Sequence, residues 1–195
     1  GSQRSPDRPS SDAHLNLEGA AKAAMSDLGE ISIAMHETTD DLNVAIWRGN
    51  RTRKNHSSKR DAFTSLNDEP IGIVSEKIEW KGKYRPTCEK TVIKSGFDEK
   101  IALVWAHPGF NSGDWENVTS SKKGVVIAGT GLGHINSNLL ESIGKTAKDM
   151  PVAMSTQCLA GTTNLNVYRN GRKLIEKGVV ELSLIHISEP TRPSS

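Results

Sequence analysis

A lysine inside a tract of polar residues is the first feature of this sequence that could do chemistry. Lys54 stands in the run 48–60, in which seven of thirteen residues are Lys, Arg or His, with hydroxyl side chains close by. A lysine ammonium held near a hydroxyl can polarise it towards nucleophilic attack, provided that a carboxylate positions the ammonium. The composition alone favours a solvated basic loop, because charged runs usually face water.

The segments around this tract have the apolar patterns of regular elements, which must position it. We expect a helix at 15–25 with small and apolar residues on one face, and strands at 30–35, 43–47 and 71–74. Lys54 then falls in a loop, and residues 61–67 form a turn. Ser11 and Asp12 precede the helix, where a short acceptor side chain can cap the free N–H groups of the first turn.

The second half of the chain alternates strand and helix patterns. We expect strands at 100–105, 123–128 and 151–155, and helices at 136–148 and 168–176. Such alternation predicts a parallel sheet with right-handed crossovers, so the fold class is α/β. The glycine-rich loop 129–134 follows a strand, but its third glycine comes one residue early for a dinucleotide-binding motif.

Bulk properties exclude several classes. The net charge of +2 gives no global argument for a nucleic-acid binder, and the two cysteines stand in no paired motif. No apolar run approaches the length of a membrane span, and the start carries no signal-peptide pattern. We therefore expect a cytoplasmic protein without membrane contact, metal or cofactor.

Several separated motifs resemble the asparaginase/glutaminase superfamily of threonine amidohydrolases, in the order that the superfamily has them. They are the run 1–13, Met35-His36, Arg53-Lys54, Asp61-Ala62-Phe63 and Ser65-Leu66-Asn67 in the first half, then 129–134 and 155–168 in the second. Within the superfamily they are most similar to the family of D subunits of archaeal glutamyl-tRNA(Gln) amidotransferases, which has the runs 3–13 and 53–61 almost as they stand here. The matches cover most of residues 1–180.

The resemblance implies roles for individual residues. Lys54 corresponds to the lysine of a catalytic threonine–lysine–aspartate set. Ser2 corresponds to a position that lines the substrate pocket, and His134 to a side chain that faces the substrate from the second domain. Asp12 and Asn16 stand near the site without doing chemistry; for Asp12, helix capping alone is an equal alternative.

Two histidines carry alternatives of their own. His36 could be a base, but a histidine at a strand end is more often a structural hydrogen bonder. His134 could merely cap the helix that follows it. The resemblance instead implies a homodimer through the asparaginase-like domains, in which the second domain of one subunit completes the active site of its neighbour. His134 and Lys54 of one chain are then expected to lie beyond side-chain contact.

The resemblance also divides the chain. Residues 1–75 correspond to the C-terminal half of an asparaginase-like first domain, 76–99 to a linker, and 100–181 to the C-terminal α/β domain. Short strands within the linker, such as 78–80, could fold against the first domain. Residues 182–195 depart from the family and are expected to be a non-native tail. The two family segments that carry the nucleophilic threonines do not occur here, so we expect a fragment that is inactive alone.

Three functions follow as hypotheses. In the first, the intact protein releases ammonia from glutamine or asparagine, and a partner subunit uses it to amidate glutamate on tRNA(Gln). In the second, it is a free-standing L-asparaginase. The third, of another class, is a basic RNA-binding module centred on residues 48–60, but aromatic residues for base stacking occur only at its edges.

Overall fold

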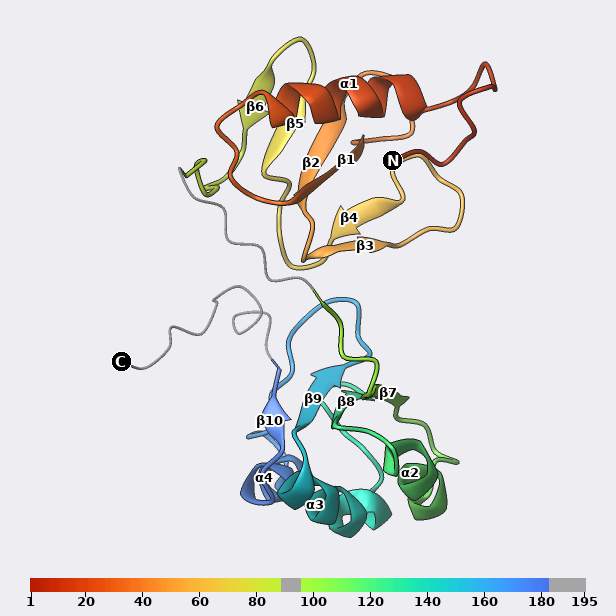
Figure 1. Cartoon of the computed structure of the whole chain (residues 1–195), viewed down its shortest axis with the longest axis vertical. Helices are drawn as coiled ribbons and strands as arrows, with labels where there is room; N and C mark the ends of the chain where they lie inside the picture. The colour runs from red at the N-terminus through yellow and green to blue at the C-terminus, as the bar shows by residue number, and fades with distance from the viewer. Residues whose placement is uncertain (89–95, 183–195) are drawn as a thin grey trace. The chain divides into compact units, whose positions relative to one another are not determined.

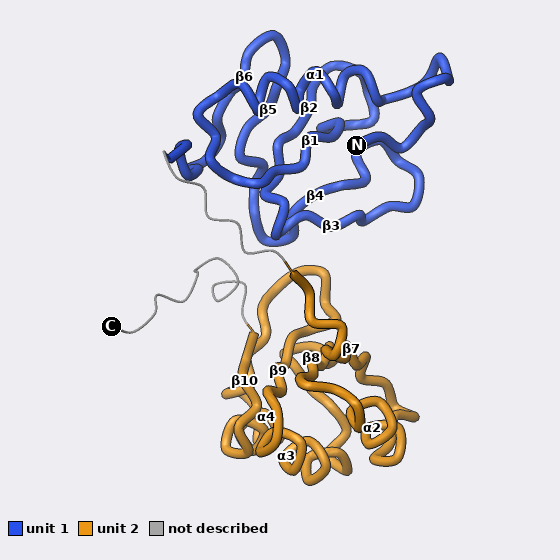
Figure 2. Tube along the Cα trace, viewed as in Figure 1, with its two compact units in different colours: residues 1–93 blue, residues 94–195 orange. Residues whose placement is uncertain are grey.

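The protein is described here by a computed structural model, which covers residues 1–88 and 96–182. The chain divides into two compact units, residues 1–93 and 94–195 (Figure 2). Each unit is described by itself. Apart from Leu182, the tail expected at 182–195 lies outside the described residues.

An antiparallel sheet with one covering helix forms unit 1. Its strands are β1 (Ser32–His36), β2 (Val44–Arg48), β5 (Gly72–Val74) and β6 (Ile78–Trp80), in the order β1-β2-β5-β6. Helix α1 (Ala13–Ala24) lies along one face (Figure 1). Its small residues allow close approach: a Cβ on Gly19 would lie 2.7 Å from Cγ1 of Val44. The predicted helix and three predicted strands of this half are thus confirmed, with ends shifted by one or two residues.

A second, two-stranded sheet holds Lys54. Strand β3 (Thr52–Lys54) pairs antiparallel with β4 (Phe63–Ser65), and Lys54 lies opposite Phe63. The predictions of a loop at Lys54 and of a turn at 61–67 were therefore wrong. Three-residue strands are too short to show an alternating pattern, so the polar composition concealed them. Their pairing makes the Lys54 segment a hairpin with defined register.

Residues 76–87 pack against unit 1. Strand β6 extends the first sheet by pairing with β5. Beyond it, the Tyr84 hydroxyl donates a hydrogen bond of 2.6 Å to Asp27, and the backbone N–H of Thr87 donates to the Asp27 carbonyl at 2.7 Å. This part of the expected linker is thus structurally part of the first unit.

Unit 2 is a parallel sheet, as the alternation of elements predicted. The strands β7 (Ile101–Trp105), β8 (Gly124–Gly129), β9 (Val152–Thr156) and β10 (Val180–Glu181) are arranged in the order β10-β9-β8-β7, and each pair is parallel. The connecting helices are α2 (Ser112–Thr119), α3 (Leu140–Asp149), preceded by the 3₁₀ turn η1 (Ser137–Leu139), and α4 (Arg169–Glu176). They gather along one side of the sheet (Figure 1).

Helix α2 was not expected from the sequence. It begins with a capping box, in which the Asn111 side chain accepts from the N–H of Asp114 and the Asp114 carboxylate accepts from the N–H of Asn111. Such a reciprocal pair satisfies two of the free donors of a first turn. The Asn-x-x-Asp spacing was therefore the available signal, although the helix has only eight residues.

The core of unit 2 lies between the sheet and these helices. Strand β7 alternates exposed and buried residues: Ala102 and Val104 are buried, whereas Leu103 is 64% exposed. From the helices, Ile143 and Leu174 are almost fully buried in the same cluster. No helix among the described residues is long and apolar enough to cross a membrane.

The exposure contrast predicts different costs for the same substitution at two leucines. Leu174→Ala removes a side chain that is 1% exposed and leaves a cavity, which should lower the free energy of unfolding of unit 2 by about 2–5 kcal/mol. Leu103→Ala is the matched control and should cost less than about 1 kcal/mol. Urea unfolding followed by circular dichroism measures both, and similar losses for the two variants would contradict this placement of the core.

Candidate functional site

A buried carboxylate organises the N-terminal loop. Asp12 is fully buried, and its side chain accepts hydrogen bonds of 3.0 Å from the backbone N–H groups of Gln3 and Arg4. A third bond of 3.0 Å comes from Nδ2 of Asn16. Asp12 occupies the N-cap position of α1, but its side chain makes no cap hydrogen bond. The capping alternative for this side chain was therefore wrong: it fixes a loop that precedes the helix.

The surroundings favour the charged form of this carboxyl group. Burial by itself raises the pKa of Asp12, but the backbone N–H groups of Gln3 and Arg4 and the nearby His36 more than offset it, so the pKa lies below the usual value of 3.8. The loop is thus held by an ionised group at neutral pH.

Asn16 and His36 continue this interaction across the sheet. The Asn16 amide Nδ2 donates to the Gly1 carbonyl at 2.9 Å, and its Oδ1 lies 2.7 Å from Nδ1 of His36. His36 ends β1 and is 1% exposed. Its other ring nitrogen, Nε2, lies 3.0 Å from Oδ1 of Asp41, in the turn between β1 and β2. Both ring nitrogens are engaged, which favours the structural over the basic interpretation of His36.

The expected catalytic lysine lies at the exposed end of β3. Its Nζ donates a hydrogen bond of 3.0 Å to Oε1 of Gln3 and lies 5.9 Å from the ring centroid of Phe63. Within residues 1–88 and 96–182, Lys54 makes no ion pair. The sequence suggested that a carboxylate would position its ammonium, but the amide oxygen of Gln3 contacts it instead. Ser2 is exposed and directly precedes Gln3. Unit 1 therefore brings the N-terminal loop and the Lys54 hairpin together.

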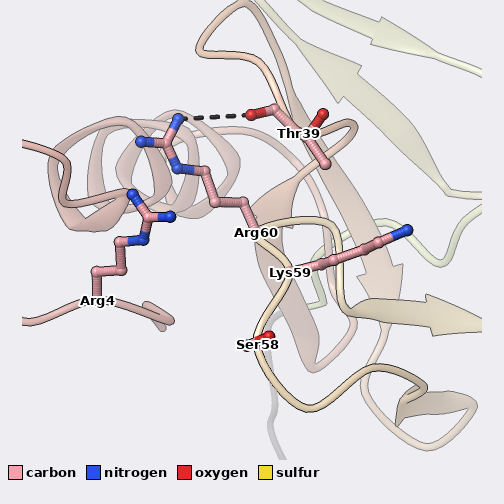
Figure 3. A pocket seen from close by; sticks show the side chains of 5 residues that line it. All are labelled: Arg4, Thr39, Ser58, Lys59 and Arg60. Carbon is pink, nitrogen blue, oxygen red and sulfur yellow. Dashed lines mark hydrogen bonds between the residues drawn. The ribbon is translucent and has the colours of Figure 1, made fainter.

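An open cleft lies beside this hairpin. Arg4, Thr39, Ser58, Lys59 and Arg60 line a cavity of about 450 Å³ (Figure 3). The Arg4 and Arg60 side chains extend to the same side, whereas Lys59 points away from them. Arg60 does not face the cleft as a free cation, because it donates to Asp41 at 2.7 Å and to the Ser10 carbonyl at 2.8 Å.

Ion pairs neutralise much of the basic run 48–60. Arg48 pairs with Glu30 and Asp68, both at 3.1 Å, and Arg51 pairs with Asp68 at 3.3 Å. With Arg60 bound to Asp41, three of the four arginines in this run face carboxylates. These contacts reduce the charge that the run offers to phosphate groups, which counts against the RNA-binding hypothesis.

His134 belongs to unit 2, at the end of the loop that follows β8. Its Nδ1 lies 3.3 Å from the carbonyl of Thr130, and its ring packs edge-on against Tyr168 with centroids 4.6 Å apart. Gly131 and Gly133 have positive φ values of 52° and 107°, which the tight return of this loop requires. The helix-capping alternative for His134 was wrong, because Asn136 supplies the cap of η1 by accepting from the N–H of Asn138.

The structure adds a pair of residues that the sequence did not predict. Arg60, from the basic run, and Asp41 link His36 to the Lys54 hairpin, but they are 19 positions apart. No spacing signal could have paired them. No group of three or more His, Cys, Asp or Glu side chains that could hold a metal ion occurs in the described part of the chain.

Comparisons with known proteins identify the family. Residues 1–86 match the model "Asparaginase, N-terminal" and residues 100–187 match the model "Glutaminase/Asparaginase C-terminal domain". The chain belongs to the asparaginase/glutaminase family, with parts of both of its domains.

Among curated proteins, the chain is similar to archaeal proteins named as the D subunit of glutamyl-tRNA(Gln) amidotransferase. It is 41% identical to that of Thermoplasma acidophilum over 182 residues, which is 93% of this chain and 44% of the relative. It is 45% identical to that of Pyrococcus furiosus over 186 residues, 92% of this chain and 42% of the relative. The chain thus spans less than half the length of these relatives.

Among solved structures, the thermostable L-asparaginase from Thermococcus kodakarensis superimposes with a TM-score of 0.85 at 30% identity. The similarity covers 94% of this chain and 55% of that one. The α/β fold expected from the sequence, with parts of two asparaginase-like domains, is confirmed.

The lowered pKa of Asp12 predicts a specific dependence of stability on pH. A carboxyl group with a depressed pKa in the folded state adds stability above its unfolded pKa, and this stability is lost as the pH falls through the folded value. Asp12→Asn should therefore lower the free energy of unfolding by about 1–3 kcal/mol at pH 7, and the difference from wild type should shrink below about pH 4.

Urea titrations of unit 1 at several pH values measure this difference. Glu76→Gln is the matched control, because Glu76 is exposed. A difference for Asp12→Asn that stays constant from pH 7 to pH 3 would show that the charge of Asp12 does not stabilise the loop.

Proposed function

We propose that this chain is part of an amidohydrolase subunit that releases ammonia from the side-chain amide of glutamine or asparagine. In the complete protein, a partner subunit that binds Glu-tRNA(Gln) would use this ammonia to form Gln-tRNA(Gln). The observation that carries the proposal is the placement of Lys54: its ammonium is exposed and is held by Gln3 of the N-terminal loop, within a region that matches the family model. The names of the relatives at 41–45% identity support the tRNA-dependent role.

The proposed role of Lys54 is electrostatic. Attack by a threonine hydroxyl on an amide carbonyl develops negative charge, first on the attacking oxygen and then on the carbonyl oxygen. A fixed ammonium beside the hydroxyl stabilises the alkoxide and so favours its formation. The threonine that the resemblance implies is not supplied by this chain. What this chain provides is the cation, Lys54. Ser2 directly precedes Gln3, the residue that holds this cation.

A homodimer would bring the second unit to the site. We propose that His134 faces the substrate in the active site of the neighbouring subunit. Its loop follows the carboxyl end of a parallel strand, which is where open α/β sheets present ligand loops. The contact with Tyr168 orients the ring at this edge.

A free-standing L-asparaginase is the second candidate. The similarity to the Thermococcus kodakarensis L-asparaginase favours it, because it extends over 94% of this chain. The two candidates differ in their need for a partner: an amidotransferase subunit should transfer ammonia to Glu-tRNA(Gln) when combined with the other subunit, whereas a free-standing enzyme should not.

Replacement of Lys54 tests the proposed chemistry in the full-length subunit. Lys54→Met removes the ammonium while keeping a long apolar side chain, and ammonia release from glutamine or asparagine should fall roughly 100-fold or more. Lys77→Met is the control, because Lys77 is exposed and lies outside the Lys54 hairpin and the lining of the cleft. A coupled ammonia assay measures both rates.

Two results would contradict this account. One is a Lys54→Met variant that keeps more than half of the wild-type turnover. The other is sustained ammonia release from residues 1–195 alone that Lys54→Met abolishes, since we expect this chain to lack the nucleophile.

A further inference from the structure

Two residues, Asp41 and Arg60, connect the Lys54 hairpin to the rest of unit 1. Arg60 lies in the loop between β3 and β4, and its guanidinium donates from one nitrogen to Asp41 and from another to the Ser10 carbonyl. The Arg60 side chain is 15% exposed, whereas that of Asp41 is 65% exposed, so the contact lies at the protein surface and its strength comes from the two hydrogen bonds of one guanidinium. The guanidinium thereby ties the hairpin both to the β1–β2 turn and to the N-terminal loop.

Asp41, the partner of Arg60, also contacts the buried ring of His36. Asn16 cannot be turned over, because its Nδ2 faces two acceptors, the Gly1 carbonyl and the Asp12 carboxylate. Its Oδ1 therefore faces His36, and the Nδ1 of that ring must be a donor.

The second nitrogen of His36 also faces an acceptor. The pKa of Asp41 is lowered by its hydrogen bonds with His36 and then with Arg60, so its carboxyl group is ionised and can only accept. The ring completes both hydrogen bonds only when both nitrogens carry protons. Asp41 is the carboxylate that contacts this buried ring.

Both ends of this interaction reach Lys54. Through Asn16 and Asp12, the network fixes the backbone of Gln3, whose Oε1 accepts from the Lys54 ammonium. Through Asp41 and Arg60, it fixes the hairpin on which Lys54 lies. The position of the ammonium is thus set from the hairpin side and from the side of its hydrogen-bond acceptor.

We propose that Arg60 and Asp41 are positioning residues for Lys54, acting through the charged contact between them and the buried His36. This inference rests on the proposed function of Lys54. It assigns a positioning role to the contact between the hairpin loop and the β1–β2 turn. Misplacement of a catalytic group by about 1 Å can cost up to 100-fold in rate, so loss of this tether should be visible in turnover.

A double-mutant cycle in the full-length subunit tests positioning as distinct from folding. Arg60→Gln should lower kcat about 10-fold with little change in KM, because the group it misplaces acts on the transition state. In a Lys54→Met background, the same Arg60→Gln change should lower the residual rate less than about 2-fold, since there is no longer an ammonium to position. Arg60→Lys should recover part of the rate by keeping the charged contact to Asp41.

Hydrogen exchange of the same full-length variants gives a readout that does not depend on activity. Arg60→Gln and Asp41→Asn should each speed exchange of the hairpin amides, such as the Asn55 N–H that donates to the Ala62 carbonyl at 2.7 Å, whereas Lys59→Gln should not. If the wild-type subunit releases no ammonia, the proposed function fails, and this measurement still decides whether Arg60 holds the hairpin.

Two results would overturn the inference. Equal rate losses for Arg60→Gln in both backgrounds would show that it acts independently of Lys54. Hairpin exchange that is unchanged in Arg60→Gln and Asp41→Asn would show that the tether does not hold the hairpin.

Discussion

The hydrogen bonds of one buried amide determine how the rest of the first unit is arranged. Asn16 donates to the Asp12 carboxylate and the Gly1 carbonyl, and it accepts from His36. The amide of Asn16 donates only from Nδ2 and accepts only at Oδ1, so each neighbouring group must be an acceptor or a donor accordingly. An anionic Asp12 then holds the N-terminal loop, and the His36 ring contacts Asp41 at 3.0 Å. Loss of any member leaves a buried polar group without its partner, which is costly in a protein interior.

This arrangement explains why a polar, basic hairpin has a fixed position. Strands of three residues contribute little stability by themselves, and the hairpin has few apolar side chains. Its position is set by Arg60 at its loop and by the Lys54–Gln3 contact at its strand end. Directional polar contacts can fix the position of a charge at the protein surface, where few apolar side chains are available to hold it by packing.

The sequence predicted the periodic parts of the fold well, because their burial follows directly from side-chain spacing. The patterned segment that became α3 is an example. The continuous apolar run that became β7 was located correctly, but it is buried on one face only, since Leu103 is 64% exposed. The hairpin around Lys54 and the short helix α2 were missed because their positions depend on pairing or capping rather than on an apolar period. For the site, the motifs selected Lys54, Asp12, Asn16 and His36. The pairing of Arg60 with Asp41 could not be predicted, since it exists only after the β1–β2 turn and the hairpin loop meet.

The protonation of His36 tests the central claim most directly, because the whole polar network depends on it. Long-range ¹H–¹⁵N correlation spectra of the imidazole rings distinguish the two neutral tautomers from the imidazolium. The account predicts that Nδ1 of His36 carries the proton that it donates to Asn16, and that the signals of the ring change in Asp41→Asn. A His36 ring in the wild-type protein whose Nδ1 carries no proton would contradict the account.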